Sequence, residues 1–204
     1  MFWMLLLHSF AFCSLFGTEN GQMSETDQKK QLSVATFAGG CFWCMQPAFD
    51  NLKGVAYTKA GYTGGHTKNP TYEQVSAGNG GHFEAVQVFY DPHVINYNQL
   101  LDAFWHNIDP ANDSGQFCDK GNQYRSVIFY ANENEKWAAE ESKNQLLRSG
   151  RFKDIYTEIL PASEFYSAED YHQNYYLKNP IRYKFYRYMC GRDKRLKEVW
   201  GKDY

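Results

Sequence analysis

The sequence has none of the short motifs that mark nucleotide sites or zinc-protease sites. Its 204 residues contain no Walker motif, no GxGxxG and no HExxH, so a phosphate-cradling loop and a protease zinc helix are both unsupported. Internal repeats and low-complexity tracts are also absent from the sequence. A chain of this length is sufficient for one globular core, and we expect one domain with extensions.

The chain also carries little net charge. Its 21 basic and 23 acidic residues give a formal charge of -2, and the isoelectric point is about 6.3. No global field therefore attracts the protein to nucleic acid or to an anionic membrane. The segment from Tyr171 onward is rich in Tyr, Lys and Arg and could stack bases, but the acidic neighbours Glu169 and Asp170 argue against this. We expect that segment to pack along the domain surface, and we expect no nucleic-acid partner.

Cysteine is too scarce for a disulfide-stabilised scaffold, so catalytic or redox use is favoured. The five cysteines are Cys13, Cys41, Cys44, Cys118 and Cys190. A zinc site could use Cys41, Cys44 and Cys118, with His82 as the fourth ligand. Structural zinc sites, however, usually combine two closely spaced pairs, and this sequence has only one. We expect no metal and no other cofactor.

The apolar stretch over the first seventeen residues is too short to span a bilayer comfortably. It precedes a polar segment and resembles an export signal, although no Lys or Arg precedes it and a clean cleavage site is missing. Translation from Met23 is the alternative. We predict a candidate signal peptide at 1–22, a polar linker at 23–31 and no integral membrane span. The protein would be periplasmic or secreted if the signal is real, and otherwise cytoplasmic.

Beyond the linker, β-prone runs alternate with amphipathic helical patterns. Such alternation predicts an α/β or α+β sandwich. The expected strands are 33–38, 54–62, 82–90, 124–130 and 155–160; the expected helices run from Cys44 toward Gly54, from Asn69 with Pro70 in the first turn, over 97–108 and over 132–148.

The run GCFWC places two thiols around two bulky aromatics. Cys41 lies between the first strand and the first helix, where the helix dipole would stabilise a thiolate and lower the thiol pKa. Phe42 and Trp43 would supply an apolar wall beside the sulfur. This combination favours redox chemistry on a nonpolar group. A buried structural pair, half of a metal site and a general dithiol oxidoreductase using Cys41 and Cys44 are the alternatives.

Glu84 is the second feature of interest. It shares a strand face with Val86 and Val88, and desolvation there would raise the carboxyl pKa and keep a proton available for donation. The alternative is a solvent-facing strand end.

Three further side chains could bind an oxygen or take part in proton transfer. Asp119 follows Cys118 in an irregular loop, where site residues concentrate. Tyr72, at a helix start, and Tyr124, at a strand start, each offer a hydroxyl. A solvated loop and ordinary surface or core tyrosines are the alternatives.

Seven segments of the sequence together resemble the A-type peptide methionine-sulfoxide reductases. The likeness covers roughly residues 35–188, and GCFW followed in order by GHxEAV and QYRS is highly specific. The segments are GCFWC (40–44), AGYTGG (60–65), NPTYEQV (69–75), GHFEAVQVFYDP (81–92), FWHNIDP (104–110), GNQYRSVIFY (121–130) and FYSAEDYHQNYY (165–176).

The resemblance implies a role for each matching residue. Cys41 would be the nucleophile and Glu84 the acid, while Phe42 and Trp43 would hold the S-methyl group. The tyrosine of NPTY and the acid and tyrosine of the D-x-G-x-QYR segment would complete the site; these are Tyr72, Asp119 and Tyr124. The implied fold is a two-layer α/β sandwich around a mixed sheet with a ferredoxin-like plait core, here over residues 32–188.

The resemblance also implies an activity. The substrate would be the S epimer of methionine sulfoxide, free or in oxidised proteins, and the role would be protein repair. Cys41 would become a sulfenic acid and then an intramolecular disulfide, which thioredoxin or a thioredoxin-like protein would reduce. We expect a monomer.

Three thiols compete to resolve the sulfenic acid. Many relatives carry glycine at the position of Cys44 and a resolving cysteine in a glycine-rich tail. Here the tail 189–204 carries Cys190, which we rank first because a mobile tail could bring it to Cys41. Cys44 is closer in sequence, and Cys118 adjoins an expected site residue.

Overall fold

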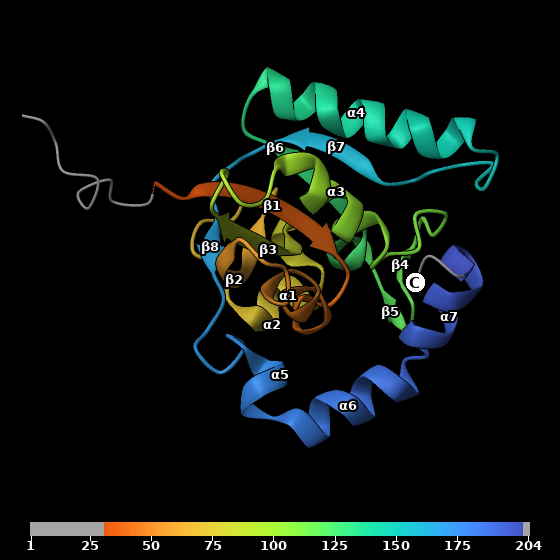
Figure 1. Cartoon of the computed structure of the whole chain (residues 1–204). Helices are drawn as coiled ribbons and strands as arrows, with labels where there is room; N and C mark the ends of the chain where they lie inside the picture. Colours follow the sequence, from red (N-terminus) through yellow and green to blue (C-terminus); the bar gives the residue numbers. More distant parts are fainter. Residues whose placement is uncertain (1–30, 202–204) are drawn as a thin grey trace, which may run out of the picture. The chain divides into compact units, whose positions relative to one another are not determined.

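The computed structural model describes residues 31–201 (Figure 1). The candidate signal peptide, Cys13 and nearly all of the predicted linker 23–31 lie outside the described residues, as do residues 202–204.

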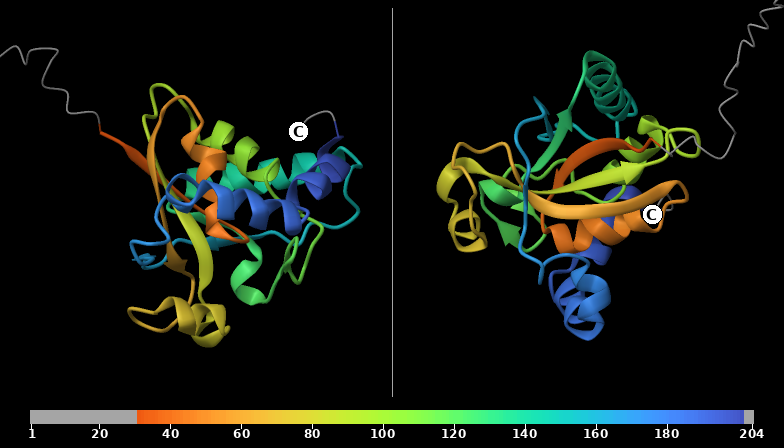
Figure 2. Two further views of the ribbon diagram at one scale, coloured as in Figure 1. Left: turned by 90° about the horizontal axis from the view of Figure 1, so that it is seen from below. Right: turned by 90° about the vertical axis from the view of Figure 1, so that its left-hand side faces the viewer.

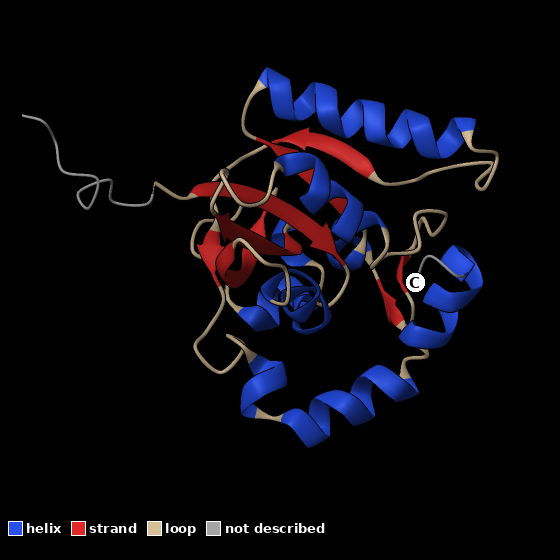
Figure 3. Ribbon diagram, in the orientation of Figure 1, coloured by secondary structure: helices blue, strands red, loops and turns tan. Residues whose placement is uncertain are grey.

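In the described part of the chain, six strands form one mixed sheet in the order β7-β6-β1-β3-β2-β8. Figure 3 shows the strands in red and the helices in blue. Neighbouring strands are antiparallel except for β6 and β7, which are parallel. This confirms the predicted mixed sheet. The strands are β1 (Ser33–Gly39), β2 (Val55–Thr63), β3 (Phe83–Tyr90), β6 (Ser126–Tyr130), β7 (Glu158–Pro161) and β8 (Tyr166–Ser167).

Alternation along the strands divides the side chains between the two faces of this sheet. One face carries Phe37 and Val86 into the main core, and the other carries Ala85 and Val127 into a smaller cluster. Glu84 lies two residues before Val86 and is therefore on the main-core face, as predicted. The carboxyl is consequently brought into an apolar layer.

Within residues 31–201 seven α-helices accompany the sheet (Figure 2). Several of them contribute side chains to the main core. The ring of Phe37, from the sheet, stacks on Phe49 of α1 and on Phe104 of α3. The ring centroids are 5.1 and 5.2 Å apart. The helices are α1 (Phe42–Asp50), α2 (Tyr72–Ser76), α3 (Tyr97–Trp105), α4 (Glu133–Arg148), α5 (Tyr175–Lys178), α6 (Pro180–Met189) and α7 (Arg192–Trp200).

Three predicted boundaries are wrong for local reasons. Helix α1 begins at Phe42 and not at Cys44, because Cys41 at the turn is already its N-cap residue. The helix also continues through Pro47. Thr71 caps α2 with its hydroxyl, so Pro70 precedes the cap instead of lying in the first turn. Tyr124 ends a 3-10 turn, η2 (Asn122–Tyr124), and β6 starts two residues later.

The C-terminal segment is not a mobile tail within the described residues. Cys190 caps α6, Gly191 turns the chain with a φ of 69°, and α7 follows. Leu196 and Trp200 of α7 are buried in the main core, and the indole N–H of Trp200 donates to the carbonyl of Ile108 at 2.9 Å. The predicted mobility was wrong because α7 has an apolar face that belongs to the core.

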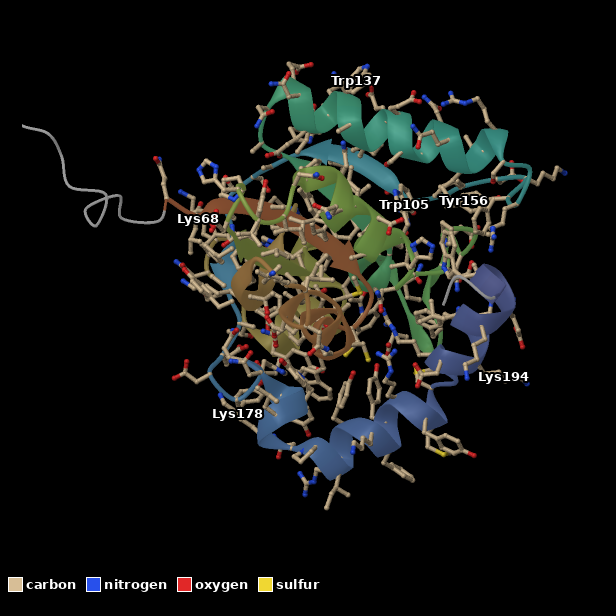
Figure 4. All side chains as sticks on the ribbon, viewed as in Figure 1. Lys68, Trp105, Trp137, Tyr156, Lys178 and Lys194 are labelled. Atoms are coloured by element: carbon tan, nitrogen blue, oxygen red, sulfur yellow. A yellow bond between two sulfur atoms is a disulfide. The ribbon has the colours of Figure 1, made fainter. Side chains whose placement is uncertain are left out.

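Helix α4 is the predicted charged surface helix. Asn132 caps it through its side chain, and Ala139 is its buried residue. Trp137 is 67% exposed on its outer side (Figure 4).

No helix within residues 31–201 is both long enough and apolar enough to cross a membrane.

Candidate active site

Cys41 lies at the turn from β1 to α1, as the sequence predicts. It is the N-cap residue of α1, and its carbonyl accepts the backbone N–H of Cys44 at 3.0 Å. Gly40 makes this turn possible, because its φ is 79° and a Cβ there would come within 2.6 Å of Gln116. The glycine before the cysteine therefore determines where the thiol points.

Glu84 closes the N-terminus of the same helix. Its Oε2 atom accepts the backbone N–H of Phe42 at 3.1 Å, and the residue is 2% exposed. Burial raises the pKa of Glu84 to about 8, although the hydrogen bond from Phe42 opposes the shift. The prediction of a desolvated carboxyl that keeps its proton near neutral pH is confirmed.

The predicted lowering of the Cys41 pKa was wrong for this state. Burial raises the pKa of the Cys41 thiol well above its ordinary value, and neighbouring negative charge on Cys44 and Glu84 adds to the rise. The backbone N–H of Phe42, at the start of α1, could have favoured a thiolate, but it donates to Glu84 instead.

Cys44 lies one helical turn below Cys41, and the two thiols are hydrogen-bonded. That bond lowers the pKa of Cys44 to about 6, with a further contribution from the positive charges of Arg192 and Arg187. The two sulfurs share a proton, so the pair holds one negative charge near neutral pH and resists a second.

Aromatic rings surround the two predicted pocket residues. Phe42 is buried and lies 5.0 Å from the His172 ring. The ring of Trp43 stacks on that of Tyr175 with a centroid distance of 3.8 Å, and it packs edge-to-face against Tyr186 with a centroid distance of 5.8 Å. These contacts give Phe42 and Trp43 aromatic neighbours and show that the aromatic segment after Tyr171 packs on the domain.

The negative charges of Glu84 and Cys41 contribute to raised pKa values at two tyrosines, Tyr72 and Tyr124. Burial raises the pKa of Tyr72 to about 12 and also raises the pKa of Tyr124. Both hydroxyls consequently keep their protons and can donate to an oxygen. Tyr72 is held by its backbone N–H, which donates to Glu169 Oε1 at 2.9 Å.

Asp119 is connected to Cys41 through Tyr186, a residue that the sequence analysis did not identify. The hydroxyl of Tyr186 donates to Asp119 Oδ2 at 2.6 Å and also forms a hydrogen bond with the Cys41 thiol. Burial raises the pKa of Asp119. Tyr186 therefore joins the nucleophile to the acidic residue.

Cys118 and Cys190 form a disulfide, while Cys41 and Cys44 are free thiols. Cys118 lies at the tip of a small hairpin made by β4 (Gly115–Gln116) and β5 (Asp119–Lys120). The four side chains weighed as zinc ligands are not brought together: Cys118 is bonded to Cys190, and the ring of His82 is hydrogen-bonded to Thr67 and Gly65.

Three functional neighbours were missed by sequence reasoning. His172 accepts the indole N–H of Trp43 at 3.0 Å, and burial lowers its pKa, so the ring is neutral. Arg192 is buried and donates to the carbonyls of Gly39 and Asn107. The third is Tyr186. His172 lies within the segment that carries the resemblance, whereas nothing in the local sequence distinguishes Arg192 or Tyr186 from surface residues.

A buried thiol beside a proton-holding carboxyl, under an aromatic wall, defines a thiol-dependent oxidoreductase site. A family model described as peptide methionine sulfoxide reductase matches residues 33–204. This chain belongs to that family.

Individual relatives agree with this assignment. The peptide methionine sulfoxide reductase MsrA of Bacillus licheniformis is 51% identical over 87% of this chain and 97% of its own. The reduced form of Mxr1 from Saccharomyces cerevisiae has a TM-score of 0.69 at 32% identity, covering 74% of this chain and 87% of that one. Methionine sulfoxide reductase A of Corynebacterium diphtheriae has a TM-score of 0.67 at 35% identity, covering 76% and 78%.

Proposed function

We propose that this protein reduces the S epimer of methionine sulfoxide, free or in oxidised proteins, to methionine. The observation that carries the proposal is the meeting of Cys41 and Glu84 at the N-terminus of α1, beneath Phe42 and Trp43. Repair of oxidised proteins is the role that this reaction serves.

The first step forms a bond between Cys41 and the sulfoxide sulfur. A sulfoxide is a poor electrophile, so its oxygen must receive a proton as the sulfur is attacked. Glu84 supplies that proton, and Tyr72 and Tyr124 hold the oxygen. The negative charge shared by Cys41 and Cys44 provides the attacking electron pair. The S–O bond of the substrate and the new S–S bond then break as the oxygen passes, as a hydroxyl, to the Cys41 sulfur. Methionine leaves with its sulfur reduced by two electrons, and Cys41 is oxidised by the same two electrons to a sulfenic acid.

The aromatic wall selects for the methyl side of the substrate. Phe42 and Trp43 offer apolar surface to the S-methyl group, while the carboxyl of Glu84, bonded to the backbone N–H of Phe42, offers a proton to the sulfoxide oxygen. A general dithiol oxidoreductase would need no methyl pocket, so the two aromatics favour sulfoxide reduction over simple thiol exchange.

The sulfenic acid condenses with a second thiol, releases water and forms an intramolecular disulfide. Thioredoxin or a thioredoxin-like protein then reduces the enzyme by thiol exchange. We propose this partner on the resemblance to the family.

The Cys41→Ser variant tests the proposal. We expect no methionine from a single turnover with methionine sulfoxide, because serine cannot attack the sulfur or hold the oxygen as a sulfenic acid. Methionine is measured by chromatography after mixing the pre-reduced enzyme with excess substrate. Retained single-turnover reduction in this variant would remove Cys41 as the nucleophile.

The compartment is a separate proposal that rests on the N-terminal sequence alone. N-terminal sequencing of the mature protein is expected to show that 1–22 have been removed, which would place the enzyme outside the cytosol. A mature chain that begins at Met1 or Met23 would contradict export.

A further inference from the structure

The outer side of α6 carries a row of exposed apolar side chains. Ile181 is 83% exposed, Phe185 67%, Tyr188 79% and Met189 65%. Side chains three or four positions apart lie on one face of a helix, so these four residues form a single stripe, which we call the α6 stripe. Single apolar residues are common on protein surfaces, but several gathered on one exposed face mark a binding surface. The stripe is therefore a candidate site for a partner.

The fold itself does not account for the stripe. The side of α6 that faces the domain is a different one, where Tyr186 packs against Trp43 and donates to Asp119. No residue of α6 is buried, so the stripe adds nothing to the core. In Figure 1 and in the right-hand view of Figure 2, α6 lies at the lower edge of the described domain, with no other described element beyond it.

Basic side chains flank the stripe on both sides. Successive residues of a helix are about 100° apart, which places Arg182 roughly 100° to one side of Ile181 and Lys184 roughly 60° to the other. Both basic residues are exposed. Residues 171–192 contain no Asp or Glu, so no acidic side chain on α5 or α6 offsets these charges. The surface around the stripe is locally positive, although the whole chain has a formal charge of -2.

The stripe ends at a cavity with the same sign of charge. Tyr188 and Met189 line a cavity of about 540 Å³ at the junction of α6 and α7, together with Lys194 and Lys197. The one acid in its lining, Asp193, is paired with an arginine of α6. Figure 4 labels Lys194 at this end of the lower edge. A lipid phosphate would therefore meet a positive cavity at the end of an apolar row.

We propose that the α6 stripe and its basic flanks attach the protein to the surface of an anionic lipid bilayer. A helix with apolar side chains on one face and Lys or Arg beside them lies in the plane of the membrane interface. Ile181 and Phe185 enter the outer part of the acyl-chain layer, while Arg182 and Lys184 reach the lipid phosphates with their flexible side chains. The attachment is peripheral, and it goes beyond the reduction of methionine sulfoxide.

Other occupants match this surface less well. Single-stranded nucleic acid binds to rings that stack on its bases, but Ile181 and Met189 have none. A second copy of the chain would bring two positively charged helices together, because a two-fold interface uses the same surface on both subunits. An apolar peptide helix docks in a groove, whereas the stripe runs along the outer side of a helix. An anionic bilayer is negatively charged, is apolar beneath its surface and needs no groove.

Vesicle binding by the full-length protein tests the proposal. The double variant Ile181→Ser and Phe185→Ser should bind vesicles of phosphatidylglycerol and phosphatidylcholine more than about tenfold more weakly than the wild type in co-sedimentation, because two apolar side chains no longer enter the lipid. The matched control is Trp137→Ser on α4, whose side chain is exposed to the same extent as Phe185 and which should bind as the wild type does. Equal binding by the stripe variant and the wild type would overturn the proposal.

The basic flanks are tested separately. Each Lys or Arg near an anionic surface strengthens binding about fivefold, so Arg182→Gln with Lys184→Gln should weaken it about 25-fold. This loss should shrink as salt rises from about 0.05 M to about 0.5 M, and it should vanish on vesicles of phosphatidylcholine alone. Lys53→Gln with Lys68→Gln removes the same charge from exposed positions elsewhere and should have a much smaller effect. An equal loss in that control would contradict local binding by α6.

Hydrogen exchange shows where the membrane contacts the protein, which matters because the apolar residues 1–17 could also enter lipid. On anionic vesicles, additional protection of backbone amides should appear over α6, at 180–189, and not over α4, at 133–148. Protection confined to residues before 31 would exclude α6 as the anchor.

The stripe variant also serves as its own folding control. It should keep the wild-type melting temperature and the wild-type turnover of free methionine sulfoxide without vesicles, because Ile181 and Phe185 lie on the outer side of α6. A fall in both would instead assign the stripe to the fold and contradict the proposal.

Rival partners are measured without lipid. Sedimentation equilibrium should give the same mass for the wild type and the stripe variant. The proposal fails if only the wild type forms a dimer. It also fails if the wild type ignores vesicles but holds single-stranded DNA or an oxidised, unfolded polypeptide through the stripe.

Discussion

The carboxyl of Glu84 accepts the backbone N–H of Phe42 at 3.1 Å and so caps α1 at its first residue, directly after the thiol Cys41 at the N-cap position. One interaction thereby places a proton donor next to the nucleophile, although the two residues are 43 positions apart in the sequence and only the family resemblance assigned them to one site.

The first prediction concerns pH. Donation requires the protonated form of Glu84, which is lost as pH rises through about 8. Attack requires one ionised sulfur in the inner pair, which is gained as pH rises through about 6. We expect a bell-shaped single-turnover rate with its maximum between these values. In Glu84→Gln the rate should fall by about 10²–10⁴-fold and lose its alkaline limb, whereas Glu73→Gln, an exposed neighbour on α2, should match the wild type.

A rate that rises without a maximum to pH 9 or above would exclude Glu84 as the proton donor. Single-turnover measurement of methionine is chosen because steady-state rates would also contain the pH dependence of the reductant.

The second prediction concerns stability. The pKa of Glu84 is higher in the folded protein than its ordinary value of 4.5. The free energy of unfolding therefore falls as pH rises above about 4.5, because the unfolded chain loses the Glu84 proton before the folded protein does. Glu84→Gln keeps an oxygen for the N–H of Phe42 without the buried charge. We expect urea unfolding at pH 8.5 to show the variant more stable than the wild type, on the order of a few kcal/mol.

At a pH below about 4 the two proteins should be nearly equal, because the carboxyl is then protonated in both states. A stability difference that does not change with pH would contradict the buried charge as its cause.

The third prediction concerns the anchoring of α7. Trp200 is 2% exposed and its indole N–H donates to the carbonyl of Ile108. Trp200→Ala should lower the free energy of unfolding by about 3–5 kcal/mol. Trp137, which is 67% exposed on α4, provides the matched control, and Trp137→Ala should change stability by less than about 0.5 kcal/mol. Equal effects in denaturant titrations would contradict the packing of α7 into the core.

The fourth prediction concerns the pocket wall. His172 accepts the indole N–H of Trp43 at 3.0 Å, and His172→Phe would keep a ring there but remove the acceptor. One lost hydrogen bond of about 1 kcal/mol predicts a rise of about fivefold in KM for methionine sulfoxide, with a smaller change in kcat. His106→Phe, at the C-cap of α3, is the control and should leave KM unchanged. An unchanged KM in His172→Phe would show that Trp43 is held by stacking alone.

Much of the fold could be predicted because its signals are local. Alternation on β3 and the amphipathic pattern of α3 follow from which residues can face an apolar core. Errors arose at turns and ends. The 3-10 turn before β6 and the cap at Thr71 depend on backbone hydrogen bonds that hydrophobic periodicity does not report.

The C-terminal segment could not be predicted in the same way. The many charged residues of 189–204 favoured a mobile tail, yet Leu196 and Trp200 are apolar enough to anchor α7 once a matching surface exists. Whether such a surface exists depends on the packing of α3 and the sheet, which lies outside the segment itself.

The sequence by itself determined the reactive unit, because a thiol followed by two aromatics after a glycine pair is specified by neighbouring residues. Only the tertiary structure decided the proton and electron partners of that unit. Glu84 stays protonated because the sheet buries it, Cys41 stays a thiol because burial raises its pKa, and Cys118 meets Cys190 across 72 residues because a hairpin and α6 converge. These are effects of burial and proximity, which residue order alone does not specify.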